Sequence, residues 1–279
     1  MSLNYKSVLI TGASSGIGRE YALKASNFCD QMIIVGRNKV ELVKTQEIVE
    51  KNNPNCTVTL SITDLCDKSE RLNLIDLAKK RNVDLLICAS GGGNFGLFEH
   101  SNWDDEKKVI ELNVEAPTHL TRGFLDFMIP LSKNRKCGII IVSSHASFMR
   151  VPHFSVYASC KAYLNHFLLT LKQELRPYNI ELMVVLPGAT ESKFSERSGI
   201  PKKMLSTPAH PSVVVDKTYK YFGKKTYLII VPFDQIIYLA HRFLPIVFTD
   251  WLISTMQKKL LTKAGYYPNN DKISPRKAG

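Results

Sequence analysis

Short apolar runs alternate along the chain with longer segments of helical composition. Several runs, such as Met32–Val35 and Gly138–Val142, place apolar residues in direct succession. Such runs are typical of strands that are buried on both faces of a parallel sheet. The pattern predicts strands at Val8–Thr11, Met32–Val35, Thr57–Ile62, Asp84–Cys88, Gly138–Val142 and Leu182–Leu186.

Helices are predicted between these strands. Asn52-Asn53-Pro54 ends one of them and Pro177 follows another, as expected of residues that stop a helix. The predicted helices are Arg19–Cys29, Val40–Lys51, Lys68–Lys80, about Trp103–Met128, and Val156–Arg176. This alternation predicts an α/β fold: a Rossmann-like doubly wound parallel sheet in three layers. No repeat or low-complexity linker interrupts it, so we expect a single domain over residues 1–279 with a core at about residues 5–232.

The pattern becomes irregular after Pro187-Gly188. Residues 189–211 are polar and contain Gly199 and three prolines. We predict a substrate lid there, because loops that follow strand ends carry ligands in open α/β sheets. A last strand is expected at Tyr227–Val231, then a C-terminal helical extension at about residues 233–264 and a polar tail at residues 265–279.

The extension is amphipathic between Phe233 and Leu261. We favour a terminal helix that packs on the core or on a partner subunit. The alternative is a helix that lies on a membrane surface as a peripheral contact.

Composition is that of an ordinary globular protein. The chain is 44% hydrophobic and 22% charged, and no stretch approaches the ~18 uncharged apolar residues of a membrane span. The apolar run near the N-terminus is too short for a signal peptide, and the six cysteines are scattered without metal-ligand spacing. We therefore expect a cytoplasmic protein with free thiols and no metal site.

The net charge of +12 is unevenly distributed. Residues 190–279 hold 15 of the 37 Lys and Arg residues but only 6 of the 25 Asp and Glu residues. A solvated Lys-rich surface explains this excess, and attraction to an anionic substrate or membrane face is the alternative. No Arg/aromatic run or known binding module indicates a nucleic-acid partner.

Three glycines follow the first predicted strand. Gly12, Gly16 and Gly18 precede a helix in the sequence Thr-Gly-Ala-Ser-Ser-Gly-Ile-Gly. Glycines permit a tight turn and close approach of the backbone to a pyrophosphate, which the helix N-terminus attracts. The second strand is followed by Gly36 and Arg37, where an NAD site would want an acidic residue. Because Arg37 suits a 2′-phosphate, we predict NADP(H) rather than NAD(H).

Tyr157 and Lys161 are four residues apart in a predicted helix. Residues at this spacing lie on the same helical face. A nearby ammonium favours phenolate, so we expect Lys161 to lower the pKa of Tyr157 toward the range of an acid–base catalyst.

With these motifs, the sequence resembles the short-chain dehydrogenase/reductase family, in its short single-domain branch, over about residues 5–232. The resemblance implies a carbonyl reductase or alcohol dehydrogenase that transfers hydride between a nicotinamide and a ketone or secondary alcohol. It implies a catalytic tetrad of Asn113, Ser144, Tyr157 and Lys161. The implied cofactor residues are Gly12, Ser14, Ser15, Gly16, Ile17, Gly18, Arg37, Asp64, Leu65, Ala89, Gly91, Asn113, Tyr157, Lys161, Pro187, Gly188 and Ser192.

One segment departs from the family pattern. The family usually has Asn-Asn-Ala-Gly after the fourth strand, where this chain has Cys88-Ala89-Ser90-Gly91. The missing asparagines normally brace the centre of the sheet, so their loss bears on local stability and cofactor affinity. His145 and His153 lie near the site in sequence, and we interpret them as pocket wall or surface because nothing in the sequence orients either as a base.

The resemblance leaves the substrate open between a 3-oxoacyl thioester and a bulky hydrophobic ketone such as a steroid. It also implies a homodimer or homotetramer. An alternative function is a non-catalytic NADP(H)-binding sensor or scaffold, although such proteins typically lose the tyrosine or lysine that this chain keeps.

Overall fold

The computed structural model describes residues 3–201 and 208–244, and then residues 247, 251, 254–255, 258–259 and 261–262. Its strands are β1 (Ser7–Thr11), β2 (Gln31–Gly36), β3 (Thr57–Ile62), β4 (Leu85–Cys88), β5 (Cys137–Val142), β6 (Ile180–Leu186) and β7 (Tyr227–Ile229). Its α-helices are α1 (Gly16–Ala25), α2 (Lys39–Asn52), α3 (Lys68–Lys80), α4 (Trp103–Ile110), α5 (Ala116–Leu131), α6 (Ser155–Glu174), α7 (Phe194–Arg197), α8 (Pro211–Tyr221) and α9 (Pro232–Phe243).

The seven strands form one parallel sheet in the order β3-β2-β1-β4-β5-β6-β7. The chain starts at β1, winds outward to β3, and returns to β4 on the other side of β1. The direction of winding therefore changes between β1 and β4. Ligands of doubly wound sheets bind at the carboxyl ends of the strands at this point.

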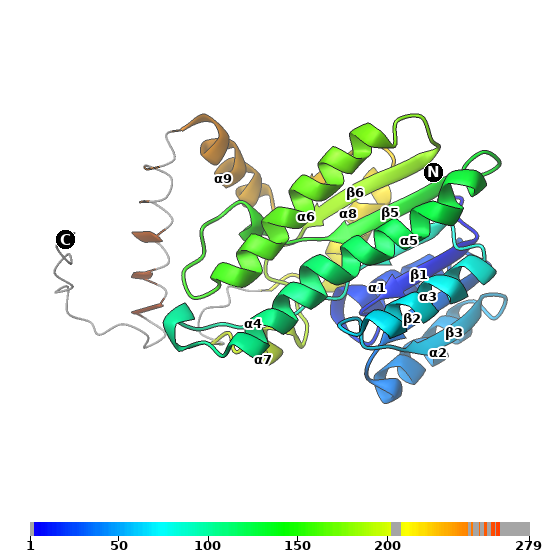
Figure 1. Cartoon of the computed structure of the whole chain (residues 1–279), viewed down its shortest axis with the longest axis horizontal. Helices are drawn as coiled ribbons and strands as arrows, with labels where there is room; N and C mark the ends of the chain where they lie inside the picture. The colour runs from blue at the N-terminus through cyan, green and yellow to red at the C-terminus, as the bar shows by residue number, and fades with distance from the viewer. Residues whose placement is uncertain are drawn as a thin grey trace.

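Helices cover both faces of the sheet (Figure 1). Side chains alternate between the faces, so that Leu9 of β1 belongs to one core cluster and Ile10 to the other. The first cluster packs against α3, α5 and α6, and the second against α1, α2 and α8. The predicted three-layer, Rossmann-like fold in a single domain is confirmed.

Two predicted elements match to the residue, the strand β3 and the helix α3. The predicted helix at Trp103–Met128 is wrong in one respect, because a π-helical turn at Glu111–Glu115 separates α4 from α5. The turn includes Asn113, whose side-chain Nδ2 donates to the carbonyl of Val109 at 2.8 Å and thereby satisfies an acceptor within the helix. The pattern of apolar positions does not show that a side chain donates to a backbone carbonyl within the helix.

The segment after Gly188 contains more regular structure than its sequence pattern predicts. The short helix α7 lies within the predicted lid, and a bridge between Thr190 and Ala209 joins the two ends of the lid. Helix α8 follows and was not predicted, although Pro211 at its start is a common first residue of helices. Helix α9 forms the first part of the predicted extension, while the predicted tail at residues 265–279 lies outside the described residues.

Candidate active site

The glycine turn after β1 is packed too closely for larger residues. Gly12 and Gly16 have φ angles of +72° and +54°, in the left-handed region that favours glycine. A Cβ on Gly18 would lie 2.2 Å from the carbonyl oxygen of Gly12, so α1 can approach β1 this closely only with glycine there. The turn therefore holds the N-terminus of α1 directly at the end of β1.

Thr11 ties the ends of β1 and β4 together. Its hydroxyl oxygen accepts hydrogen bonds from the backbone N–H groups of Ala89 and Ser90, each at 3.1 Å. A Cβ on Gly12 would lie 2.9 Å from the Ser90 nitrogen, which shows how tightly the two loops pack. Thr11 of β1 thus braces the centre of the sheet. The fourth strand of this chain is not followed by the asparagines that are usual in the family that the sequence resembles.

Two arginines lie near the carboxyl end of β2. Arg37 follows β2, and its Nη1 is 4.0 Å from Oδ2 of Asp64. Arg197 of α7 comes from the lid, and its pKa is lowered by partial burial and then by the positive charge of Arg37. Asn38 caps α2 by accepting from the Glu41 N–H at 3.0 Å. Arg197 was not predicted, because nothing in its sequence surroundings shows that the lid returns to β2.

Asn113 lies behind the glycine-rich loop that follows β4. Its side chain is buried and donates to the carbonyl of Gly92 at 2.8 Å. Its Oδ1 is buried and accepts no hydrogen bond from the part of the chain that the structure describes. A Cβ on Gly91 would lie 3.2 Å from this oxygen and 3.5 Å from Lys161 Nζ, so all three residues border one small space.

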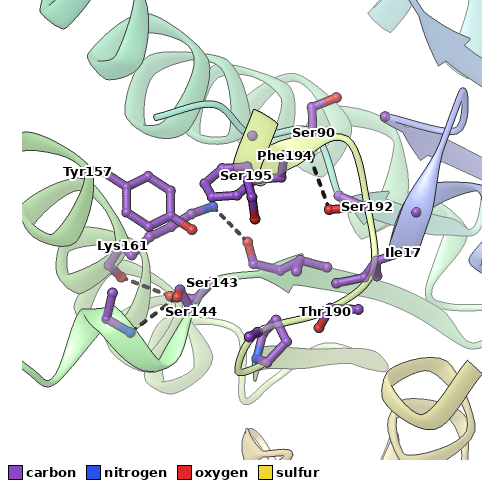
Figure 2. A pocket seen from close by; sticks show the side chains of 18 of the residues that line it. Ile17, Ser90, Ser143, Ser144, Tyr157, Lys161, Thr190, Ser192, Phe194 and Ser195 are labelled. Atoms are coloured by element: carbon purple, nitrogen blue, oxygen red, sulfur yellow. Dashed lines mark hydrogen bonds between the residues drawn. The ribbon is translucent and has the colours of Figure 1, made fainter. Parts of the chain in front are cut away.

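Ser144, Tyr157 and Lys161 lie together in one wall of the cavity (Figure 2). Lys161 Nζ donates to the carbonyl of Val142 at 3.0 Å, and the hydroxyl of Ser143 donates to the carbonyl of Lys161 at 3.0 Å. These bonds fix α6 against the end of β5. The ammonium lies 5.6 Å from the centre of the Tyr157 ring.

Burial dominates the acid–base properties of this pair. It raises the pKa of Tyr157 to about 12, opposed in part by hydrogen bonding to Ser144. It lowers the pKa of Lys161 to about 8. The expectation that Lys161 lowers the tyrosine pKa is wrong for this arrangement, since the ring is stacked against Phe154 at 4.3 Å and the ammonium is turned to a backbone carbonyl.

A cavity of about 620 Å³ joins these groups. It runs from the glycine turn past the Tyr157 wall to the lid and α9. Every residue in the predicted site lines it except Asn113, which lies behind the loop at Gly91. Ser192 of the predicted lid segment packs over the turn, because a Cβ on Gly16 would lie 2.7 Å from the Cβ of Ser192.

His145 also lines the cavity, and the sequence interpretation that nothing orients it is wrong. Its Nδ1 lies 3.0 Å from Oδ2 of Asp234, a buried residue of α9. The two residues are 89 positions apart, so sequence spacing gives no sign of the contact. The sequence offers no other signal, because the burial of Asp234 depends on how α9 packs.

The sequence model of a family described as short chain dehydrogenase matches residues 6–202. The chain belongs to the short-chain dehydrogenase family. It is an oxidoreductase of the kind that acts on CH–OH or carbonyl groups.

Relatives within this family carry different names. A 3-oxoacyl-[acyl-carrier-protein] reductase of Rickettsia conorii is 32% identical over 197 residues, which cover 71% of this chain and 78% of that protein. A 3-dehydrosphinganine reductase of Danio rerio is 30% identical over 205 residues, covering 71% of this chain and 60% of that protein. A short-chain dehydrogenase of Sphingobium yanoikuyae, solved in complex with NADPH, has a similar fold: the TM-score is 0.74 at 22% identity, and the match covers 98% of this chain and all of the other.

The described helices give no sign of a membrane span in this short-chain dehydrogenase. Among them, none is both long enough and apolar enough to cross a bilayer.

Proposed function

We propose that the protein is an NADP(H)-dependent reductase of ketones, or in reverse a dehydrogenase of secondary alcohols. The observation that carries this proposal is one continuous cavity with the glycine turn at one end and Ser144, Tyr157 and Lys161 in its wall. The turn suits a dinucleotide, and the three polar groups suit a carbonyl whose oxygen gains negative charge during reduction.

The residues fit a nicotinamide dinucleotide. No side chain caps the start of α1, so its backbone N–H groups are available to an anion, and the glycines leave room for the close approach of a pyrophosphate. Asp64 and Leu65 border the cavity beyond them and would hold the adenine, while Pro187, Gly188 and Ser192 would flank the nicotinamide. When bound, NADPH supplies the hydride.

Tyr157 is the proposed general acid. Its high pKa, about 12, keeps the phenol protonated at neutral pH, as a proton donor to a carbonyl oxygen requires. Ser144 would donate a hydrogen bond to the same oxygen. Its hydroxyl oxygen accepts from the Ala146 N–H at 3.1 Å, and accepting this bond does not use the hydroxyl proton.

Lys161 and Asn113 are proposed to support this proton transfer. A protonated Lys161 would donate a hydrogen bond to the nicotinamide ribose and so hold the cofactor next to Tyr157. The buried Oδ1 of Asn113 and the ammonium border the same space at Gly91, which suits a polar path from the site.

The preference for NADP(H) rests on Arg37 and Arg197. Both line the cavity, and their positive charges are close enough to repel each other. A 2′-phosphate between them would relieve this repulsion and form charge-assisted hydrogen bonds with both guanidinium groups.

The rest of the cavity suits an apolar substrate. Its lining beyond Tyr157 is largely aromatic and aliphatic, and includes Phe95, Met149, Val151, Phe154, Phe194 and Phe233. The names of the relatives, a 3-oxoacyl reductase and a 3-dehydrosphinganine reductase, agree with a ketone on a long apolar chain. We propose a 3-oxoacyl thioester or another bulky hydrophobic ketone as the substrate class.

An association into dimers or tetramers is also proposed. Phe98, Val156 and Tyr163 border a second, shallow apolar depression over α4 and α6. Burial of such a surface against a second copy removes apolar area from water.

Turnover of NADPH with a panel of ketones tests the function. The panel includes 3-oxoacyl thioesters and bulky ketones, and Tyr157→Phe serves as the matched variant because it removes only the phenolic hydroxyl. We expect wild type to oxidise NADPH with at least one ketone and the variant to be slower by a factor on the order of 100. Binding of NADPH by both proteins without turnover of any ketone would support the alternative sensor function instead.

A further inference from the structure

His145 and Asp234 form an oriented pair beside the proposed catalytic group. Asp234 Oδ2 lies 3.0 Å from His145 Nδ1, and the aspartate side chain is 9% exposed while the histidine side chain is 33% exposed. Both residues line the cavity, and the histidine is the more exposed partner. The backbone N–H of His145 also donates to the carbonyl of Pro187 at 3.0 Å, so both the main chain and the side chain are held.

The carboxylate determines which nitrogen of the imidazole carries the proton. An ionised carboxylate can only accept, so Nδ1 must be the donor. In the neutral ring, Nε2 is then an acceptor on the opposite edge. Because the Nδ1 edge faces Asp234, the Nε2 edge is the one left for a ligand in the cavity.

The His145–Asp234 pair lies where Gly188, which has no side chain, leaves space for it. A Cβ on Gly188 would lie 3.3 Å from Asp234 Oδ2 and 3.5 Å from His145 Nδ1. It would also lie 2.9 Å from Val231 Cγ2 at the start of α9. The absence of a side chain at Gly188 thus lets α9 bring its carboxylate to His145, next to the segment proposed to flank the nicotinamide.

His145 directly follows Ser144, and both residues line the cavity. A substrate whose carbonyl oxygen meets Ser144 therefore shares the cavity with the imidazole of His145.

We propose that His145, positioned by Asp234, binds a hydrogen-bond-donating group, a hydroxyl or an amine, on the carbon next to the reacting carbonyl. The inference rests on the proposed ketone reductase function and narrows its substrate class to ketones with such a neighbour. Asp234 acts through His145 and is a positioning residue. The apolar lining of the cavity then holds the remainder of the substrate.

A matched pair of ketones separates this role from a structural one. Octan-4-one and 5-hydroxyoctan-4-one share one carbon skeleton and differ only in the hydroxyl next to the carbonyl. The measured quantity is the ratio of kcat/KM for the hydroxyketone to that for the plain ketone, because a general loss of structure cancels in the ratio. The variants are His145→Leu, His145→Asn and Asp234→Asn, with His100→Leu as a control at an exposed histidine outside the cavity.

We expect His145→Leu to lower the ratio about 10-fold, the value of one lost hydrogen bond. His145→Asn keeps an acceptor and should restore part of the preference, and Asp234→Asn should fall between wild type and His145→Leu. The control should leave the ratio unchanged. An equal loss of activity toward both ketones in His145→Leu would overturn the proposal and show that the pair only joins α9 to the cavity wall.

A measurement without turnover separates failure of this inference from failure of the proposed function. In ¹⁵N-histidine NMR spectra, the signal absent from His145→Leu belongs to His145. It should show a proton on Nδ1 in wild type and lose that preference in Asp234→Asn. Addition of octane-4,5-diol to the NADP⁺-loaded Tyr157→Phe variant, in which turnover is slowed, should shift the Nε2 signal, and octan-4-ol should not. No shift with the diol would contradict the inference even if the protein reduces ketones, whereas a shift without any ketone turnover would contradict only the proposed function.

Discussion

At the scale of single residues, the motif formed by Tyr157 and Lys161 predicts only part of the acid–base chemistry of the site. The spacing of Tyr157 and Lys161 correctly indicates that both line one cavity. It does not predict that burial dominates both groups and moves their pKa values apart, to about 12 for Tyr157 and about 8 for Lys161. Burial depends on Phe154 and on the end of β5, which no local spacing reports.

The lowered pKa of Lys161 predicts the pH dependence of ketone reduction. Lys161 carries its positive charge below pH 8 and loses it as the pH rises through this value, while Tyr157 keeps its proton until about pH 12. The kcat/KM for reduction should therefore be level below about pH 8 and fall above it. Lys161→Arg keeps its charge at higher pH and should move the fall upward. A wild-type profile that stays level to pH 10 would contradict this assignment.

The two arginines predict the choice of cofactor. Arg37→Ala should lower the preference for NADPH over NADH about 10-fold, and Arg197→Ala should lower it in the same direction, because each removes a charge-assisted contact to the 2′-phosphate. The ratio of the two dissociation constants, measured by quenching of protein fluorescence, checks this. Lys51→Ala removes an exposed charge at the far end of α2 and should leave the ratio unchanged. An unaltered ratio in both arginine variants would show that the 2′-phosphate binds elsewhere.

At the scale of helices and strands, the hydrophobic pattern predicts most of the sheet. The alternation of strand and helix patterns along the chain suffices to place β3 and α3. The π-helical turn at Asn113 escapes prediction because its cause is a side chain that bonds Val109 and Gly92. Helix α8 escapes because its composition is mixed and its contacts with α1 are made at long range, as between Thr218 and Tyr21.

Arg71 connects several elements through contacts that the sequence does not show. It is 1% exposed, donates to the carbonyl oxygens of Leu65 and Cys66 at 2.7 and 3.1 Å, and pairs with Glu115. It therefore joins α3 to the start of α5 and to the loop proposed to hold the adenine.

Arg71→Met should lower the free energy of unfolding by about 3 kcal/mol, because it leaves two carbonyl oxygens and a carboxylate without their donor. Arg122→Met removes an exposed pair with Asp126 on α5 and should cost less than about 0.5 kcal/mol. Urea denaturation of both variants measures the difference. Equal free energies of unfolding of the two variants would show that Arg71 does not stabilise the packing of α3 against the start of α5.

The whole molecule brings distant segments to one edge of the sheet. Gly12, Asp64, Ala89, Ser144 and Gly188 each follow a different strand and all line one cavity. Order along the chain and the rule that ligands bind at strand ends suffice to predict this meeting. The return of Arg197 and Asp234 to the same cavity could not be predicted, since the lid and α9 lie after the regular pattern ends.

The central claim is that the cavity delivers hydride to a carbonyl carbon while Tyr157 supplies the proton. Transfer of deuterium from NADPH that carries deuterium in both positions at C4 tests it most directly, with the alcohol product analysed by mass spectrometry. We predict one deuterium on the former carbonyl carbon with wild type, and formation of this product slower by a factor on the order of 100 with Tyr157→Phe at unchanged NADPH affinity. Unlabelled alcohol, or equal rates for the two proteins, would contradict the account.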